Sequence, residues 1–214
     1  MNSPRGITMS ALVAGFKRLP AMTFAALLSA APLFSQSNPV TLENALAGSP
    51  ASEWDISGYG DETIQGFATP FSINTGGTVN FKIDVPAGVQ YSIRIYRLGY
   101  YGGAGARRIA TLGNFTGVAQ PEPLYQESTG MTSCANWSVS ASWTAYDTLR
   151  SMNAFSGIYV AKLTRNDTQG ASHIVFIVRD DAAPSDILFK TADGTWQAYN
   201  DYGGNNFYSE GRNI

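Results

Sequence analysis

The sequence predicts an all-β protein, and three observations support this prediction. Seven or eight short apolar segments are separated by turn residues at near-regular spacing. Between Pro50 and Asp181 no segment has the 3.6-residue periodicity of an amphipathic helix. The 214 residues include 22 Gly and 11 Tyr but only 14% charged residues, against roughly 25% in typical globular chains. Together these features favour an antiparallel β-sandwich of immunoglobulin type.

The clearest strands are two segments in which apolar and polar side chains alternate. Residues 78–85 and 91–98 both have a period of two, which is typical of a strand buried on one face. Residues 86–90 are expected to join them as a hairpin loop, and residues 166–170 to form the turn of a second hairpin. Further strands are expected at 54–56, 64–67, 107–112, 137–143, 157–163 and 172–179.

Apolar residues on the inward faces of these strands make up the expected core. Because side chains alternate across a strand, every second residue points to the same side of its sheet. A chain of this length can bury a sizeable core. The expected core residues are Trp54, Phe81, Ile83, Ile93, Ile95, Trp137, Tyr159, Ala161, Leu163, Ile174 and Phe176.

The first 37 residues are predicted to be a signal peptide. Three basic residues precede an apolar run over residues 21–34, which is too short to span a bilayer. Small residues at Ser35 and Ser37 permit cleavage before residue 38, which leaves a linker over 38–49. An N-terminal membrane anchor that is never cleaved is the alternative. In both cases the body is expected to be exported, as a secreted or periplasmic protein, and after cleavage it has no membrane partner.

The charge of the chain argues against nucleic acid as a partner. The net charge is −2 at pH 7, which creates no basic field to attract a phosphate backbone. Lys and Arg form no cluster beside aromatic residues. Nucleic-acid binding is therefore excluded.

Three ionisable features have both a functional and a structural interpretation. Cys134 is the single Cys and has no partner for an internal disulfide, so it is either an inert thiol, which we favour, or a nucleophile. His173 is the single His and lies in the middle of an expected strand, which favours a structural role over that of a general base. Asp180, Asp181 and Asp186 lack the spacing of a calcium loop and favour a solvated linker.

A domain boundary is predicted at residues 182–184. The sequence "DDAAPSD" ends the last expected strand, and the apolar run "DILFK" then begins a new one. The sandwich therefore covers residues 50–181, and residues 184–214 begin a second domain. About thirty residues are too few to bury a core of their own. The expected partner of this segment is a missing C-terminal domain.

The glycine-rich segment "YRLGYYGGAGARRI" at residues 96–109 has four Gly within seven residues. Such a backbone can adopt positive φ and approach other groups closely. Nucleotide binding is excluded, because the spacing is not GxGxxG and no helix follows. A tight turn between strands is favoured over a ligand-binding loop, although Tyr100, Tyr101, Arg107 and Arg108 are candidates for an interdomain surface.

The segment "TWQAYNDYGGNNFY" at residues 195–208 is rich in aromatic residues. Phenols can bind a strongly Lewis-acidic cation, which lowers their pKa from about 10 and stabilises the phenolate. Tyr199, Tyr202 and Tyr208 are therefore candidate metal ligands. Aromatic packing at a domain interface is the alternative that composition favours.

Several segments together resemble the secreted relatives of the N,N-dimethylformamidase large (beta) subunit. They are "SEWDISGYGDETIQGFAT", "YRLGYYGGAGARRIATL", "SGIYVAKLTRND", "ASHIVFIVRDD" and "DILFKTADGTWQAYNDYGGNNFY", which follow one another over residues 43–208. The resemblance implies an immunoglobulin-like domain followed by an α/β domain similar to glutamine amidotransferases. It also implies a mononuclear iron held by two tyrosines and a glutamate with a histidine nearby, and hydrolysis of a C–N amide bond. A small amide is then the substrate class.

The resemblance extends to single residues of the terminal segment. The family motif W-x-A-Y-N-x-(W/Y)-G-G implies that Tyr199 is the first iron tyrosine, with Tyr202 as the second choice. The other tyrosine and a His-Asp-Glu segment have no counterpart here, so the chain is expected to be an inactive N-terminal fragment with no catalytic residue of its own. Relatives tend to have a partner for Cys134 in the preceding loop, and this chain does not. The alternatives are an accessory module that binds polysaccharide through exposed Tyr100 and Tyr101, or a structural spacer. The residues that match the motif are Trp196, Ala198, Tyr199, Asn200, Tyr202, Gly203 and Gly204.

Overall fold

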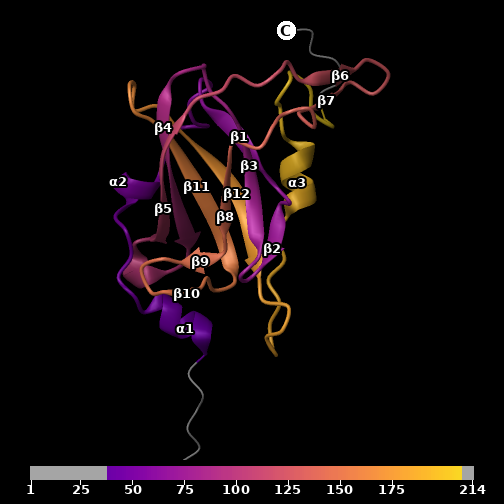
Figure 1. Ribbon diagram of the computed structural model, residues 1–214. Coiled ribbons are helices and arrows are strands. Elements are labelled where there is room, and N and C mark those ends of the chain that lie inside the picture. The colour runs from indigo at the N-terminus through magenta and orange to yellow at the C-terminus, as the bar shows by residue number, and fades with distance from the viewer. Residues whose placement is uncertain (1–37, 209–214) are drawn as a thin grey trace, which may run out of the picture. The chain divides into compact units, whose positions relative to one another are not determined.

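A computed structural model describes residues 38–208 of the chain (Figure 1). The predicted signal peptide lies outside the described residues. Within them no helix is long and apolar enough to cross a membrane. The elements in chain order are α1 (Pro39–Asn44), α2 (Ala51–Trp54), β1 (Gln65–Thr69), β2 (Ser72–Asn74), β3 (Thr78–Asp84), β4 (Gln90–Leu98), the 3-10 helix η1 (Tyr101–Gly103), β5 (Ala106–Thr116), β6 (Leu124–Gln126), β7 (Met131–Ser133), β8 (Ala141–Thr144), β9 (Tyr146–Asp147), β10 (Met152–Asn153), β11 (Gly157–Arg165), β12 (Ala171–Arg179) and α3 (Asp193–Ala198).

Two sheets form a β-sandwich, which confirms the predicted all-β class. In the described part of the chain the larger sheet has the strand order β2-β12-β11-β4-β5, and the smaller sheet has the order β1-β3-β8. β2 pairs in parallel with β12, whereas the other pairs of these two sheets are antiparallel. The short ladders β6-β7 and β10-β9 lie outside the two sheets. The immunoglobulin-like detail stays a prediction.

The second predicted hairpin is confirmed, and the first is wrong. β11 and β12 pair directly, and the backbone N–H of Arg165 donates to the carbonyl of Gly170 (2.9 Å) to close the turn. In contrast, β3 pairs with β1 and β8, while β4 pairs with β11 and β5. Residues 86–90 therefore carry the chain from one sheet to the other. Both strands alternate in polarity because each turns one face to the shared core, and alternation alone does not reveal which strands pair.

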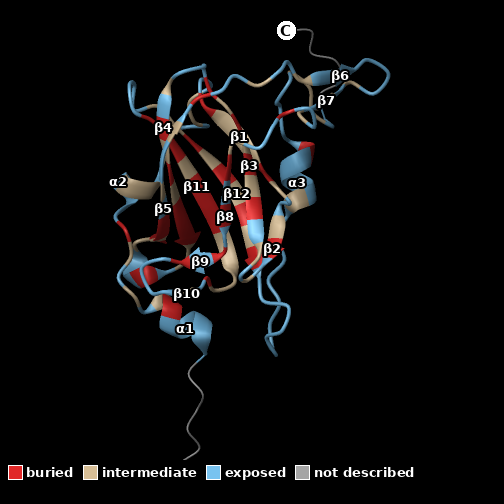
Figure 2. Cartoon of the chain, viewed as in Figure 1, coloured by how far each residue is buried: buried red, intermediate tan, exposed pale blue. Residues whose placement is uncertain are grey.

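The core lies between the two sheets, where buried residues gather (Figure 2). Phe176 of β12 lies at its centre, with ring centroids 5.6 Å from Phe81 of β3 and 5.9 Å from Trp143 of β8. Such tilted and edge-to-face aromatic pairs add to the stabilisation that burial of their area supplies. The expected core residues that are buried are Phe81, Ile83, Ile93, Ile95, Trp137, Tyr159, Ala161, Leu163, Ile174 and Phe176.

Trp54 is the exception, because it does not lie in a strand of the core. It ends α2, where the backbone N–H of Asp55 donates to the carbonyl of Ala51 (2.8 Å). Its side chain is half-buried, and its indole N–H donates to the carbonyl of Ala104 (3.1 Å). Pro50 precedes this short helix, a position in which the missing N–H of proline costs nothing. The expected strand at 54–56 is therefore wrong.

Candidate functional site

The terminal segment folds back on itself and packs beside the β6-β7 hairpin. After α3, the backbone N–H of Phe207 donates to the carbonyl of Ala198 (3.1 Å). Gly203 and Gly204 both have positive φ, 85° and 86°. A Cβ at Gly203 would lie 2.1 Å from Oγ1 of Thr132 on β7. A glycine is therefore required at this position both for backbone conformation and for the close approach of the hairpin.

Tyr202 is packed into the surface of the sandwich. Its ring lies edge-on to Trp137, with centroids 6.3 Å apart and an interplanar angle of 88°. Its hydroxyl lies near the thiol of Cys134, and each group shifts the pKa of the other. Burial, followed by the interaction with Cys134, raises the pKa of Tyr202 to about 12. Tyr202 is therefore a neutral phenol at physiological pH.

Tyr199 has different neighbours from those of Tyr202. It caps the C-terminal end of α3, and its side chain is 61% exposed. Its ring stacks on that of Tyr208, with centroids 4.6 Å apart and an interplanar angle of 28°. The structure brings together Tyr199 with Tyr208, and Tyr202 with Trp137 and Cys134. It does not bring Tyr199 and Tyr202 to a common partner.

By themselves, residues 38–208 do not assemble the iron site that the family resemblance implies. Residues 38–208 contain no group of three His, Cys, Asp or Glu side chains that could hold a metal ion. His173 lies on β12, where its Nε2 is 2.6 Å from the carbonyl oxygen of Trp54. The carboxylate and imidazole that would complete a set with a tyrosine are therefore not assembled here. No chemical step through a metal follows from this part of the chain.

The glycine-rich segment forms a tight turn, as expected, and only one of its two tyrosines is exposed. Tyr100 is 72% exposed, whereas Tyr101 in η1 is 3% exposed. The Tyr101 hydroxyl donates to Oε1 of Glu43 (2.9 Å) and accepts from Nη1 of Arg97 (3.0 Å). The alternative in which an exposed Tyr101 binds polysaccharide is therefore wrong, because Tyr101 is buried and its hydroxyl is hydrogen-bonded to Glu43 and Arg97.

A buried charge cluster around Glu43 was not foreseen from the sequence. Glu43 of α1 is completely buried, and its Oε1 accepts from Nε of Arg107 (2.8 Å) on β5. Its Oε2 accepts from Nη1 of Arg150 (2.7 Å), and Arg107 also pairs with Oδ2 of Asp147 (2.5 Å) on β9. Each charge has an opposite charge within hydrogen-bonding distance. The cluster joins α1 to the larger sheet and has a structural role.

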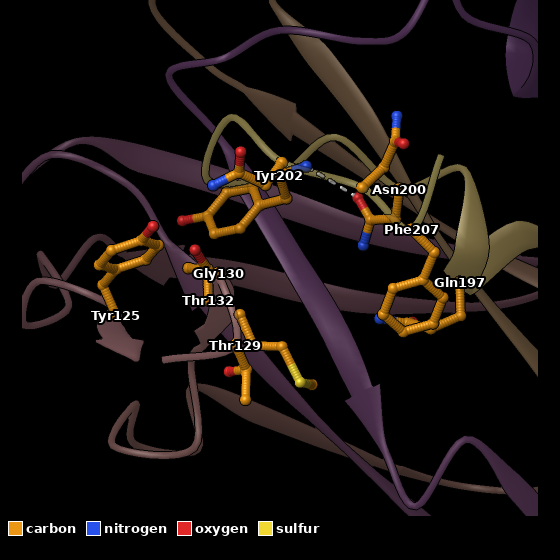
Figure 3. A pocket seen from close by; sticks show the side chains of 11 residues that line it. Tyr125, Thr129, Gly130, Thr132, Gln197, Asn200, Tyr202 and Phe207 are labelled. Carbon is orange, nitrogen blue, oxygen red and sulfur yellow. Dashed lines mark hydrogen bonds between the residues drawn. The ribbon is translucent and has the colours of Figure 1, made fainter. Parts of the chain in front are cut away.

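A pocket of about 320 Å³ lies between the β6-β7 hairpin and the terminal segment (Figure 3). The hairpin supplies aromatic, hydroxyl and thioether groups, and the terminal segment supplies carboxamides and two aromatic rings. Neither the hairpin nor the carboxamides were identified as functional from the sequence. The lining residues are Tyr125, Thr129, Gly130, Met131, Thr132, Gln197, Asn200, Tyr202, Asn205, Asn206 and Phe207.

The interaction between Tyr202 and Cys134 leads to a first prediction. Burial raises the pKa of the Cys134 thiol, and the hydroxyl of Tyr202 lowers it by hydrogen bonding. The variant Tyr202→Phe keeps the ring against Trp137 but removes this hydroxyl. We expect its thiol pKa to rise further and its alkylation by iodoacetamide at pH 8.5 to slow severalfold. An alkylation rate equal to that of the wild type would show that the hydroxyl does not act on the thiol.

A second prediction concerns His173 and pH. Burial lowers the pKa of His173 from its ordinary value of 6.5. The unfolded chain therefore takes up a proton at higher pH than the folded chain. The stabilisation by neutral His173 is complete above about pH 6.5 and is lost as the pH falls through the folded-state pKa. We expect His173→Gln, which can still donate to the carbonyl of Trp54, to have a flatter stability profile in this window, as measured by urea unfolding. If the stability of the wild type and of His173→Gln changed with pH in the same way, this role of His173 would be contradicted.

Comparison with known proteins identifies the family. The family model described as "N,N-dimethylformamidase beta subunit-like, C-terminal" matches residues 92–214, from within β4 onwards. No curated protein matches the chain. Among solved structures, murine CEACAM1b is similar at 13% identity and a TM-score of 0.25, over 55% of this chain and 54% of that chain. The similarity thus spans about half the length of the murine protein. The family match extends over more than half of the present chain, which belongs to the N,N-dimethylformamidase beta subunit-like family.

Proposed function

We propose that this chain is the N-terminal part of an exported dimethylformamidase-like protein that hydrolyses a C–N amide bond. The β-sandwich would carry and position an α/β catalytic domain, of which residues 184–214 would be the opening. The iron that the family resemblance implies would be held by that domain and would activate the amide carbonyl and water. The sandwich with its opening segment would be inactive alone.

The observation that carries this proposal is an exposed apolar run after β12. Ile187, Leu188 and Phe189 are 86%, 90% and 77% exposed, and they form no strand in the structure. Single exposed apolar residues are ordinary, but a contiguous apolar surface marks a site of interaction. A strand also needs a neighbour to pair its backbone groups. The run therefore has the composition of a strand, and its neighbouring strands would lie in a further domain.

The test compares the 214-residue chain with the native product, which is the protein that the natural gene expresses. We expect that product to contain about one iron per chain and to release dimethylamine from N,N-dimethylformamide or a related small amide. We expect the 214-residue chain to release none. In the native product Tyr199→Phe should lower both iron content and hydrolysis, while Tyr100→Phe, at an exposed tyrosine outside the segment, should change neither. A native product without iron and without amidase activity would contradict the proposal.

The accessory-module alternative loses its structural basis at the glycine-rich loop. A flat platform for polysaccharide needs neighbouring exposed rings, and Tyr101 is buried against Glu43. Of the two tyrosines in this loop, only Tyr100 is exposed. The amidase reading therefore has the stronger support.

A further inference from the structure

We propose that the pocket between the β6-β7 hairpin and the terminal segment binds a neutral, polyhydroxylated ligand of the size of one or two sugar rings. This site goes beyond amide hydrolysis, and part of its lining is the terminal segment that the proposed function assigns to the catalytic domain. Its volume of about 320 Å³ lies at the lower end of the range of about 300–1,000 Å³ that ligand pockets cover. The site therefore suits a small ligand or the terminal unit of a longer one.

The lining carries no permanent charge. It contains no Asp, Glu, Lys, Arg or His, and its ionisable groups are the phenols of Tyr125 and Tyr202. Tyr202 is neutral, since burial raises its pKa to about 12. An anion or a cation would leave water for this pocket without meeting an opposite charge, which is costly. The pocket therefore selects uncharged ligands.

The polar groups of the lining make a purely apolar ligand unfavourable. The side chains of Gln197, Asn205 and Thr132 form no hydrogen bonds with other described residues, and neither does the hydroxyl of Tyr125. These groups supply both donors and acceptors around one hollow. An apolar ligand would remove them from water with no compensating hydrogen bond. A ligand rich in hydroxyl groups would satisfy them.

Aromatic rings supply the remaining surface. Figure 3 shows Tyr125 on the hairpin and Tyr202 on the terminal segment, with Phe207 towards the other end beside Gln197. Aromatic side chains present an apolar face, and tyrosine adds a polar edge. A sugar ring has the matching surfaces, C–H groups on its face and hydroxyl groups on its rim. The combination of aromatic faces with carboxamides and hydroxyls therefore favours a saccharide over a small amide, which would fill only part of the site.

The experiment is ligand-observed NMR and calorimetry on the full chain with glucose, N-acetylglucosamine, cellobiose and xylobiose. N,N-dimethylformamide serves as the small-amide comparison. We expect at least one saccharide to bind. Tyr125→Ala should weaken that binding about tenfold, which is about 1.4 kcal/mol, because the aromatic face of Tyr125 is lost. Asn205→Leu, which removes a carboxamide and keeps the size of the side chain, should weaken it as well.

Tyr59→Ala is the matched control, since Tyr59 is an exposed tyrosine outside the pocket, as Tyr125 is exposed within it. Saccharide binding that is unchanged in Tyr59→Ala and weakened in the two pocket variants supports the proposal. Three results would overturn it: no saccharide binds, binding is insensitive to Tyr125→Ala, or dimethylformamide competes for the same site more strongly than any sugar. The saccharide measurements use the 214-residue chain, whereas amide hydrolysis is measured on the native product, so failure of one proposal is distinguishable from failure of the other.

Discussion

Replacing Glu43 with Ala is expected to lower the free energy of unfolding by about 3–5 kcal/mol, the range for removing one partner of a buried ion pair. The carboxylate is completely buried. It is paired with Arg107 (2.6 Å) and Arg150 (2.7 Å). The hydroxyl of Tyr101 also donates to it. Without Glu43, Arg107 keeps only Asp147 as its counter-ion, and α1 loses its anchor on the larger sheet.

Urea unfolding followed by tryptophan fluorescence measures this effect. Glu62→Ala is the matched control, because Glu62 is exposed and takes part in no ion pair in the described chain. Its effect should stay within about 0.5 kcal/mol. Glu43→Gln, which keeps the shape and one acceptor oxygen, should fall between the two. The account of the cluster fails if Glu43→Ala and Glu62→Ala unfold at the same urea concentration.

Phe176→Ala is the second large effect, with an expected loss of about 3–5 kcal/mol. The ring is fully buried at the centre of the sandwich and contacts aromatic rings of both sheets. Its centroid lies 5.6 Å from that of Tyr159 in its own sheet and 5.9 Å from that of Trp143 in the opposite sheet. Truncation leaves a cavity that these large, mutually packed rings cannot close.

The same unfolding experiment on Phe189→Ala provides the control for residue type. Phe189 is 77% exposed, so its truncation should change stability by no more than about 0.5 kcal/mol. A small effect of Phe176→Ala, comparable to that of Phe189→Ala, would mean that the two sheets do not share the core described here.

Most strands of the two sheets were predictable from the sequence, and their partners were not. The alternation in β3 and β4 is a local property, because successive side chains of any strand point to opposite faces. Pairing depends on residues far away in the chain. Val79 of β3 lies opposite Trp143 rather than a residue of β4. The short connection between the two strands, residues 86–90, therefore suggested a hairpin that does not form.

The candidate site shows the same limit. The terminal motif was visible because its aromatic residues are close together in the sequence. Tyr125, which lies across the pocket from it, is on a short hairpin with no apolar pattern. The sequence around Glu43 did not indicate that this residue is buried, because its burial depends on Arg107, 64 residues further along the chain. Tyr101 was expected at the surface, because the glycines around it are typical of an exposed loop.

The most direct test of the proposed function is the coding DNA through and beyond the codon for Ile214. The account predicts that the reading frame continues for a few hundred codons and encodes a further tyrosine motif and a His-Asp-Glu segment. The exposed run from Ile187 to Phe189 would then be the first strand of the catalytic domain. A stop codon directly after Ile214 would contradict the account, because the chain would then contain no catalytic domain for the sandwich to carry.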